Sequence, residues 1–177
     1  MNSKVTHINV GNLAENCWFL ANEDTKEAVV IDPGAEPDRI CATAEKHGWK
    51  ITAILLTHGH IDHMGACESL RTELGVKVYA LTEEEDLLLD AKKNLSVFID
   101  RKVVSFEPDQ LLRDGQDLTL VGMKIQVIHT PGHTPGGCSY YVADAGCVFS
   151  GDTLFAESVG RSDFPGGSTS ALVRAVK

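Results

Sequence analysis

The sequence predicts an α/β fold in which several strands end in polar side chains at one edge of a sheet. Three apolar runs, at 54–56, 125–128 and 147–149, are typical of buried strands, and histidine or aspartate follows each closely. Helical patterns at 37–47 and 64–74 lie between predicted strands. Open α/β sheets bind their ligands at the edge where such strands end. The polar clusters are therefore expected to converge there.

The first half of the chain predicts five short strands, at 5–10, 17–21, 28–31, 51–56 and 77–80. A helix over 37–47 is expected to end at Gly48, and a second helix is expected over 64–74. Residues 82–85 match a capping box, which predicts a helix that reaches about Lys93. The glutamates in this box are expected to form a solvated first turn, which the helix dipole favours.

The second half of the chain begins with its least regular segment. Residues 94–116 carry no clear period and are expected to be loop with short extended pieces. Four further strands are predicted at 118–121, 124–129, 138–143 and 147–150. Ser168 is a suitable N-cap for a helix over 169–177, which contains no glycine or proline as a stop signal. The chain is therefore expected to stop inside this helix.

The run THGHIDH carries the strongest chemical signal of the chain. Three imidazoles and one carboxylate lie within it, directly after an apolar strand. His58 and His60 are two apart, so an extended backbone points both to the same side, and Gly59 lets the chain bend. Asp62 and His63 follow one turn later. Neutral imidazoles suit zinc, iron and similar ions, and a carboxylate extends the set to harder cations, so the run predicts a metal site.

Two later segments strengthen this prediction. Alternating prolines and glycines after His129 predict a rigid, irregular loop that holds His133 at one position. Asp152 lies just past the apolar run at 147–149, again at the end of a predicted strand. His129 ends its own strand and is expected to be structural. His133 and Asp152 therefore join the candidate metal ligands.

Composition and charge indicate an enzyme domain of ordinary size. The chain has 177 residues, of which 43% are hydrophobic and 23% charged; these are globular values and predict a single domain over residues 1–177. Sixteen basic and twenty-five acidic residues give a net charge of −9, which disfavours nucleic acid and anionic membranes as partners. Five cysteines without a C-x-x-C pair, and no signal peptide or membrane span, predict reduced thiols in a cytoplasmic protein.

Four motifs together resemble the metallo-β-lactamase superfamily and, within it, the glyoxalase II-like (hydroxyacylglutathione hydrolase-like) hydrolases. They are THGHIDH at 57–63, HTPGHTPGG at 129–137, SGDTLF at 150–155 and GRSDFPGG at 160–167. The resemblance covers nearly the whole chain. It implies an αββα four-layer sandwich of two mixed β-sheets flanked by helices, with a metal pair at one edge.

One departure from the family concerns the end of this pattern. Such enzymes carry a final histidine on a strand beyond the SGD segment. The seven histidines here lie at positions 7, 47, 58, 60, 63, 129 and 133, and none follows Asp152. The chain is therefore expected to lack the last strand and helix of the sandwich, and so to be C-terminally incomplete.

The resemblance implies two divalent metal ions, with zinc expected and iron or manganese as alternatives. Carried over residue by residue, it assigns a first site of His58, His60 and His133 and a second site of Asp62, His63 and the bridging Asp152. A hydroxide between the ions would be the nucleophile, because metals lower the pKa of bound water. Asp62 is expected to be catalytic, since it would orient this hydroxide.

Further positions are expected to support these ligands or bind the substrate. Asp32 is predicted to hydrogen-bond a ligand histidine, since metal-bound imidazoles usually have an outer partner, and Thr57 flanks the ligand loop. Arg161 lies where related thioesterases hold a cation for the substrate. Asp163 and Phe164 belong to the same loop and are expected to line the pocket.

These residues together favour hydrolysis of a thioester of the hydroxyacylglutathione type by a metal-bridging hydroxide. A thiolate leaving group needs little protonation, so no general acid is required. The expected partner is a small-molecule thioester, and the chain is expected to be a monomer or homodimer. Two alternatives stay open. One is a mononuclear iron sulfur (persulfide) dioxygenase that uses His58, His133 and Asp152; the other is an inactive fragment or metal-binding scaffold.

Overall fold

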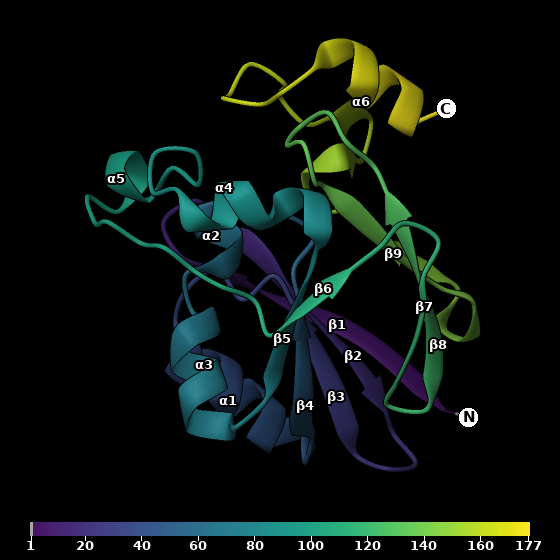
Figure 1. Ribbon diagram of the computed structural model, residues 1–177. Helices are drawn as coiled ribbons and strands as arrows, with labels where there is room; N and C mark the ends of the chain where they lie inside the picture. The colour runs from purple at the N-terminus through teal and green to yellow at the C-terminus, as the bar shows by residue number, and fades with distance from the viewer. Residues whose placement is uncertain (1) are drawn as a thin grey trace.

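The computed structural model describes residues 2–177 (Figure 1). Its first sheet has six strands in the order β1-β2-β3-β4-β5-β6. These strands are β1 (Ser3–Val10), β2 (Glu15–Asn22), β3 (Glu27–Ile31), β4 (Lys50–Leu55), β5 (Lys77–Leu81) and β6 (Gln110–Leu112). The first three strands pair antiparallel and the remaining pairs are parallel, so the sheet is mixed.

The second sheet has four antiparallel strands in the order β10-β9-β8-β7. These strands are β7 (Asp117–Leu120), β8 (Met123–His129), β9 (Cys138–Val142) and β10 (Cys147–Phe149). Met123, Ile125 and Val127 are buried in the core between the sheets, whereas Lys124 and Gln126 between them are exposed. The two-residue period of a strand produces this alternation when only one face of the sheet lies in the core.

β3 is buried on both faces because it lies between two cores. Val29 and Ile31 belong to the core shared with the second sheet, and Ala28 and Val30 belong to the core on the other face. The helices α1 (Pro37–His47) and α3 (Cys67–Leu74) cover that other face (Figure 1). A strand covered on both faces is apolar along its length, which explains the unbroken apolar run at this position.

The outer face of the second sheet is open. Ile128, Tyr141 and Val148 are exposed on it, so no helix of residues 2–177 covers this face. Within the described residues, the αββα arrangement therefore has both sheets and one of its two helical layers in place. The last helix, α6 (Thr169–Ala175), packs instead against the loop after β8, where its Leu172 is buried.

The strongest local signals of the sequence are confirmed. α1 has the predicted bounds, with proline in its first turn and Gly48 in the left-handed conformation at its C-cap. Ser168 caps α6, because its Oγ accepts the N–H of Ala171 at 3.3 Å. The expectation that this helix continues to residue 177 is wrong, because α6 ends at Ala175.

The prediction of one helix over 64–74 is wrong. The segment divides into α2 (Ile61–Met64) and α3, with a break between them. The cause is a close contact with the loop after β3, since a Cβ on Gly65 would lie only 2.3 Å from the carbonyl oxygen of Gly34. The break gives the ligand run its own helical turn, on which His63 lies.

The capping box predicted at 82–85 is also wrong. A 3-10 turn leads here into α4 (Glu85–Leu89). Thr82 does not cap the helix, because its Oγ1 donates to the carbonyl oxygen of Leu112 on β6 at 2.8 Å. The prediction that these glutamates form a solvated turn is wrong for Glu84, which is only 1% exposed.

The following segment is more ordered than its sequence indicates. The helix predicted to reach Lys93 ends earlier, because Asp90 Oδ1 accepts the N–H groups of Lys92 and Lys93 at 2.8 and 3.2 Å. Within the expected loop over 94–116, the structure has the short helix α5 (Ser96–Ile99) as well as the extended piece β6. Asn94 Nδ2 donates to the carbonyl oxygens of Leu88 and Val104 at 3.2 and 2.8 Å, and contacts of this kind have no periodic signature in the sequence.

A small hairpin follows β10 and is not indicated by any sequence pattern. Its strands are β11 (Leu154–Phe155) and β12 (Ser158–Val159), which pair antiparallel. Its apolar side chains are exposed, so no alternation of buried and polar residues marks it. None of the helices in residues 2–177 is long and apolar enough to cross a membrane.

Candidate metal centre

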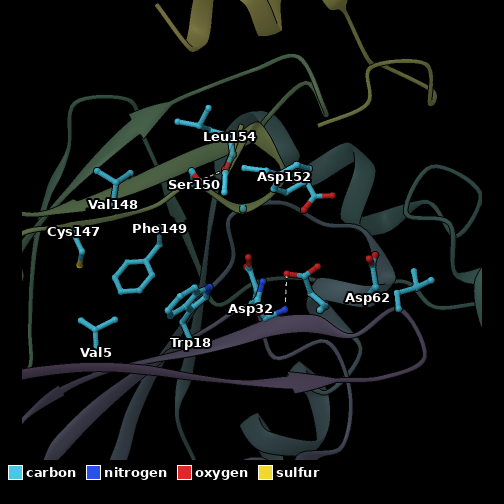
Figure 2. Close-up of a pocket in the computed structure, with 16 residues that line it drawn as sticks. Val5, Trp18, Asp32, Asp62, Cys147, Val148, Phe149, Ser150, Asp152 and Leu154 are labelled. Carbon is cyan, nitrogen blue, oxygen red and sulfur yellow. Dashed lines mark hydrogen bonds between the residues drawn. The ribbon is translucent and has the colours of Figure 1, made fainter. Parts of the chain in front are cut away.

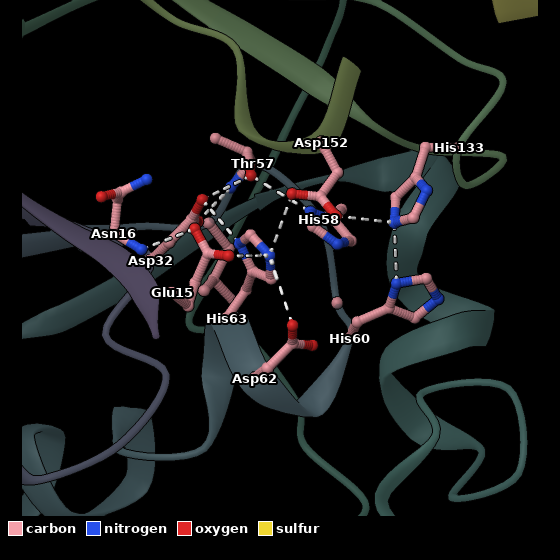
Figure 3. A network of polar contacts seen from close by, with 12 residues as sticks. Glu15, Asn16, Asp32, Thr57, His58, His60, Asp62, His63, His133 and Asp152 are labelled. Carbon is pink, nitrogen blue, oxygen red and sulfur yellow. Dashed lines mark hydrogen bonds and ion pairs between the residues drawn. The ribbon is translucent and has the colours of Figure 1, made fainter. Parts of the chain in front are cut away.

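Two loops bring three histidines together (Figure 3). His58 and His60 lie in the loop after β4, and His133 lies in the loop after β8. His60 Nδ1 is 3.0 Å from His133 Nε2, and the His58 ring centroid is 4.9 and 4.8 Å from the other two centroids. Each residue offers a ligand atom within 4.8 Å of the other two. This first group unites the three histidines that the sequence assigns to one site.

The chemical state of these rings fits a metal. His58 Nε2 and His60 Nε2 are buried and have no hydrogen-bond partner. An unpaired buried polar atom costs about 1–3 kcal/mol. Burial, with the neighbouring histidines, lowers the pKa of His60 to about 3 and the pKa of His58 well below its usual value. Both rings are therefore neutral at physiological pH, which is the form that binds zinc or iron.

A backbone contact selects the reactive nitrogen of His133. Its Nδ1 lies 2.7 Å from the carbonyl oxygen of Arg161. A carbonyl oxygen can only accept, so Nδ1 carries the ring proton and Nε2 presents its lone pair to the other imidazoles. Such an outer partner is typical of a metal-bound histidine. The backbone carbonyl of Arg161 thus orients the ring of His133, a role that the type of its side chain does not predict.

A second group of donors surrounds His63, beside the first. His63 Nε2 is fully buried and lies 3.3 Å from Asp152 Oδ1 and 3.8 Å from Asp62 Oδ2. Asp152 Oδ2 is 3.4 Å from His133 Nε2, so Asp152 presents one oxygen to each group. Burial alone would raise the pKa of Asp152, but His63 and the other histidines hold it below its usual value. Asp152 is therefore an anion at the bridging position that the resemblance implies.

Glu15 also belongs to the second group, and the sequence does not single it out. Its Oε2 is 3.3 Å from His63 Nε2. Glu15, Asp62 and His63 offer ligand atoms within 4.8 Å of one another. Glu15 is the first residue of β2, and only the pairing of distant segments brings it to the ligand run.

Asp32 fixes both the start of the ligand run and the ring of His63. Its Oδ1 accepts the Thr57 N–H at 2.7 Å. Its Oδ2 accepts the Thr57 hydroxyl at 2.6 Å and the His63 Nδ1–H at 3.0 Å. Burial acts to lower the pKa of His63, but Asp32 and the other carboxylates outweigh it and raise this pKa. Asp32 and Thr57 thus lie where supporting residues are expected.

Glu84 ties the two ligand loops together, and the sequence misses it. Its Oε1 accepts the Gly59 N–H and its Oε2 accepts the Gly136 N–H, each at 2.8 Å. Gly59 lies between two ligand histidines, and Gly136 lies in the loop of His133. Burial raises the pKa of Glu84 to about 7. The sequence feature that could have indicated this contact is the glycine in each loop, because glycine lets a backbone come close to another segment.

The predicted substrate-binding residues border the first group without converging on it. Arg161 Nε and Nη2 donate to Asp163 at 2.7 and 2.6 Å, and the guanidinium lies 4.0 Å from the ring centroid of Phe164. Both charged side chains are exposed. The Phe164 ring is 5.6 Å from that of His60, centroid to centroid. Phe164 therefore flanks the histidines, while the guanidinium is engaged by Asp163.

A cavity of about 600 Å³ opens beside the second group (Figure 2). Asp62 and Asp152 lie on its polar wall, and Trp18, Phe149 and Leu154 supply apolar surface. This size and this mixed lining suit a small organic molecule. The carboxylates of the second group therefore open directly onto the cavity.

Comparison with known proteins agrees with this geometry, since the Metallo-beta-lactamase superfamily matches residues 10–177. The chain belongs to the metallo-β-lactamase superfamily. "Hydroxyacylglutathione hydrolase GloC" of Haemophilus influenzae is 33% identical over 92% of this chain and 77% of its own length. The crystal structure of the BLEG-1 B3 metallo-beta-lactamase is 36% identical, with a TM-score of 0.91 over 98% of this chain and 83% of its own. TTHA1623 in a di-iron-bound form is 35% identical, with a TM-score of 0.83 over 97% of this chain and 83% of its own.

The metallo-β-lactamase fold binds divalent metals, and the donors of this member fit such ions. The fit rests on the orphaned Nε2 of His58, on His60 Nδ1 and His133 Nε2, which face each other at 3.0 Å, and on the carboxylate of Asp152 between the two groups. Bound metal ions would give these nitrogens a partner and would also offset the charge of the carboxylate.

Proposed function

We propose that this chain is a metal-dependent hydrolase that cleaves small-molecule thioesters of the hydroxyacylglutathione type. The observation that carries the proposal is the position of Asp152, which presents one oxygen to His133 and the other to His63. Two donor groups that share a carboxylate suit a pair of divalent ions. The substrate class is supported by the 33% identity to GloC, which is named a hydroxyacylglutathione hydrolase.

The ligands of the metal pair would be His58, His60 and His133 in the first group and His63, Asp62 and Asp152 in the second. When bound, the pair supplies a water of lowered pKa and polarises the substrate carbonyl. Three imidazoles suit zinc, and the di-iron form of TTHA1623 makes iron the second candidate.

Asp62 is the residue best placed to handle the proton. Its carboxylate lies on the wall of the cavity, 3.8 Å from His63 Nε2. In the reaction, the water oxygen bonds to the acyl carbon, Asp62 takes the proton and the C–S bond breaks. The sulfur leaves as a thiolate. A thiol has a pKa of about 8.5, so this leaving group needs no dedicated acid.

The proposal includes a cytoplasmic location. All five cysteines are free, and three of them are buried. Free thiols fit a reducing compartment, where disulfides are rare.

The direct test is thiol release from S-lactoylglutathione by zinc-loaded and iron-loaded protein. We expect release that a chelator abolishes and that His60→Ala lowers by more than the roughly 10- to 100-fold that the loss of a residue supporting a ligand costs. His47→Ala is the control, because His47 stacks on Trp49, 4.3 Å between centroids, outside the site. Protein that carries two ions per chain and releases no thiol would overturn the proposed substrate class.

A mononuclear sulfur dioxygenase is the second candidate. It is favoured by the proximity of His133 Nε2 to Asp152 Oδ2, 3.4 Å, with His58 alongside. Two imidazoles and one carboxylate suit non-haem iron with open positions. One iron per chain, with oxygen uptake on a persulfide, would favour this activity over hydrolysis. A chain that holds no metal would favour the scaffold alternative.

A further inference from the structure

We infer that Glu15 is a metal ligand in the second group, which then consists of one imidazole and three carboxylates. The donors are His63, Asp62, Asp152 and Glu15. The inference rests on the two-metal centre of the proposed function, but it does not depend on the substrate. The carboxylate of Glu15 lies as close to His63 Nε2 as that of Asp152 does, 3.3 Å in each case.

The backbone holds the Glu15 carboxylate in place. Oε1 accepts the N–H of Asn16 at 2.8 Å, which leaves Oε2 facing His63 Nε2 at 3.3 Å. Glu15 pairs with Val10 across β1 and β2, so its Cα is fixed by a strand rather than by a loop. The side chain is only 19% exposed. Its direction is therefore set before any ion arrives.

His63 Nε2 is the second, independent sign of a ligand. This nitrogen is fully buried and has no hydrogen bond, while Nδ1 is engaged by Asp32 at 3.0 Å. Carboxylate oxygens of Glu15, Asp152 and Asp62 lie 3.3, 3.3 and 3.8 Å away from Nε2. Donors held about 2.1 Å from one ion at tetrahedral angles lie about 3.4 Å apart. The spacings match ligands of a common ion better than hydrogen bonds of about 2.9 Å.

Charge leads to the same conclusion. Three carboxylates converge on one imidazole, which carries at most one positive charge. No lysine or arginine within residues 2–177 lines the adjoining cavity. Partly buried carboxylates without cationic partners are unfavourable, and a divalent cation would offset their repulsion.

The two groups would then differ in metal preference. The first group has three imidazoles beside the shared Asp152, and imidazoles suit zinc, whereas the oxygen donors that dominate the second group suit harder ions such as Mn²⁺. The ratio of Mn²⁺ affinity to Zn²⁺ affinity is therefore expected to be higher in the second group. Removing the Glu15 charge should lower Mn²⁺ affinity in that group and leave the first group unchanged.

The experiment titrates metal-free full-length chain with Mn²⁺ and follows the free ion by electron paramagnetic resonance. We expect the wild-type chain to bind two ions. In Glu15→Gln, the affinity for the ion in the second group should fall by roughly tenfold or more. Glutamine keeps the oxygen that accepts from Asn16. The control is Glu27→Gln, because Glu27 pairs with Asn22 at the opposite end of β2. Circular dichroism of the metal-free variants checks that each is folded.

Substitution with Co²⁺ gives a spectroscopic readout that would not change if Glu15 had only a structural role. In Glu15→Gln, the visible spectrum of the second Co²⁺ equivalent should change while that of the first stays the same. Equal Mn²⁺ affinity and an unchanged second Co²⁺ spectrum in this variant would overturn the inference, as would binding of a single ion by wild type. Glu15-dependent binding of a second ion without thiol release would refute the proposed substrate and leave this inference standing.

Discussion

His63 donates its Nδ1–H to Asp32 Oδ2 over 3.0 Å, although the two residues lie 31 positions apart in the chain. The contact leaves Nε2 as the one ring nitrogen that faces the carboxylates of the second group. Asp32 also accepts the N–H and the hydroxyl of Thr57. One buried carboxylate thus sets both the direction of a ligand ring on α2 and the start of the loop that carries His58 and His60.

We expect Asp32→Asn to weaken metal binding in the second group by about 10- to 100-fold. Asp32 accepts from three donors, and an asparagine would turn its NH₂ toward one of them. Competition with a chromogenic chelator measures the change. Asp38→Asn, an exposed position on α1, is the control. Unchanged affinity in Asp32→Asn would mean that packing alone orients His63.

Glu84 makes the stability of the metal-free protein depend on pH. Its pKa is about 7 in the folded protein against 4.5 for an ordinary glutamate. Between these values the folded state holds a proton that the unfolded chain has lost, so the free energy of unfolding falls as pH rises. The stabilisation is complete below about pH 4.5 and is lost above about pH 7, a change of roughly 3 kcal/mol.

Glu84→Gln should remove this contribution, because an amide does not titrate. The drop in unfolding free energy from pH 4.5 to pH 8, measured in urea, should be about 3 kcal/mol smaller than in wild type. At pH 4.5 the variant should already be less stable by about 1–3 kcal/mol, since its NH₂ meets a backbone N–H. Glu83→Gln, at the exposed neighbouring position, should follow wild type. An identical pH dependence in Glu84→Gln would refute the assignment.

Metal should stabilise the folded chain through the first group. Zinc at 100 times its dissociation constant should raise the free energy of unfolding by about 2.7 kcal/mol. His133→Ala should lose most of this increment, because it removes one of three imidazoles, whereas His47→Ala should retain it. Thermal unfolding with and without zinc measures the effect. An increment that survives in His133→Ala would place the ion elsewhere.

The elements that the sequence predicts well are those with local signals. The helix over 37–47 starts at a proline and ends at a glycine, and both signals act within one turn. The ligand histidines are recognisable because three of them fall in one short run. Asp152 and His133 carry a weaker signal, because they lie three and four residues after the ends of β10 and β8.

The residues that the sequence misses act over long distances. Glu84 accepts from two loops that lie 25 and 52 positions away. From the local sequence, Glu84 is one of several glutamates at the start of a helix. Its burial depends on the tertiary fold and therefore cannot be predicted from this local pattern. Glu15 is likewise an ordinary strand residue until β2 places it beside α2. The broken helix after His63 has the same cause, because the contact of Gly65 with Gly34 overrides helix propensity.

The contact of Gly136 with Glu84 leaves no room for a side chain. A Cβ on Gly136 would lie 2.1 Å from the backbone nitrogen of Glu84, so the ligand loop or the 3-10 turn must shift. Gly136→Ala should lower the free energy of unfolding by about 1–3 kcal/mol and weaken zinc binding near His133. Gly115→Ala is the matched control, because a Cβ there meets no atom within 4 Å and the backbone φ of 72° alone costs about 1–2 kcal/mol. Equal destabilisation of the two variants is compatible with the contact, so zinc affinity separates them. It should fall only in Gly136→Ala. An equal affinity in both variants would show that the loop of His133 does not depend on its contact with Glu84.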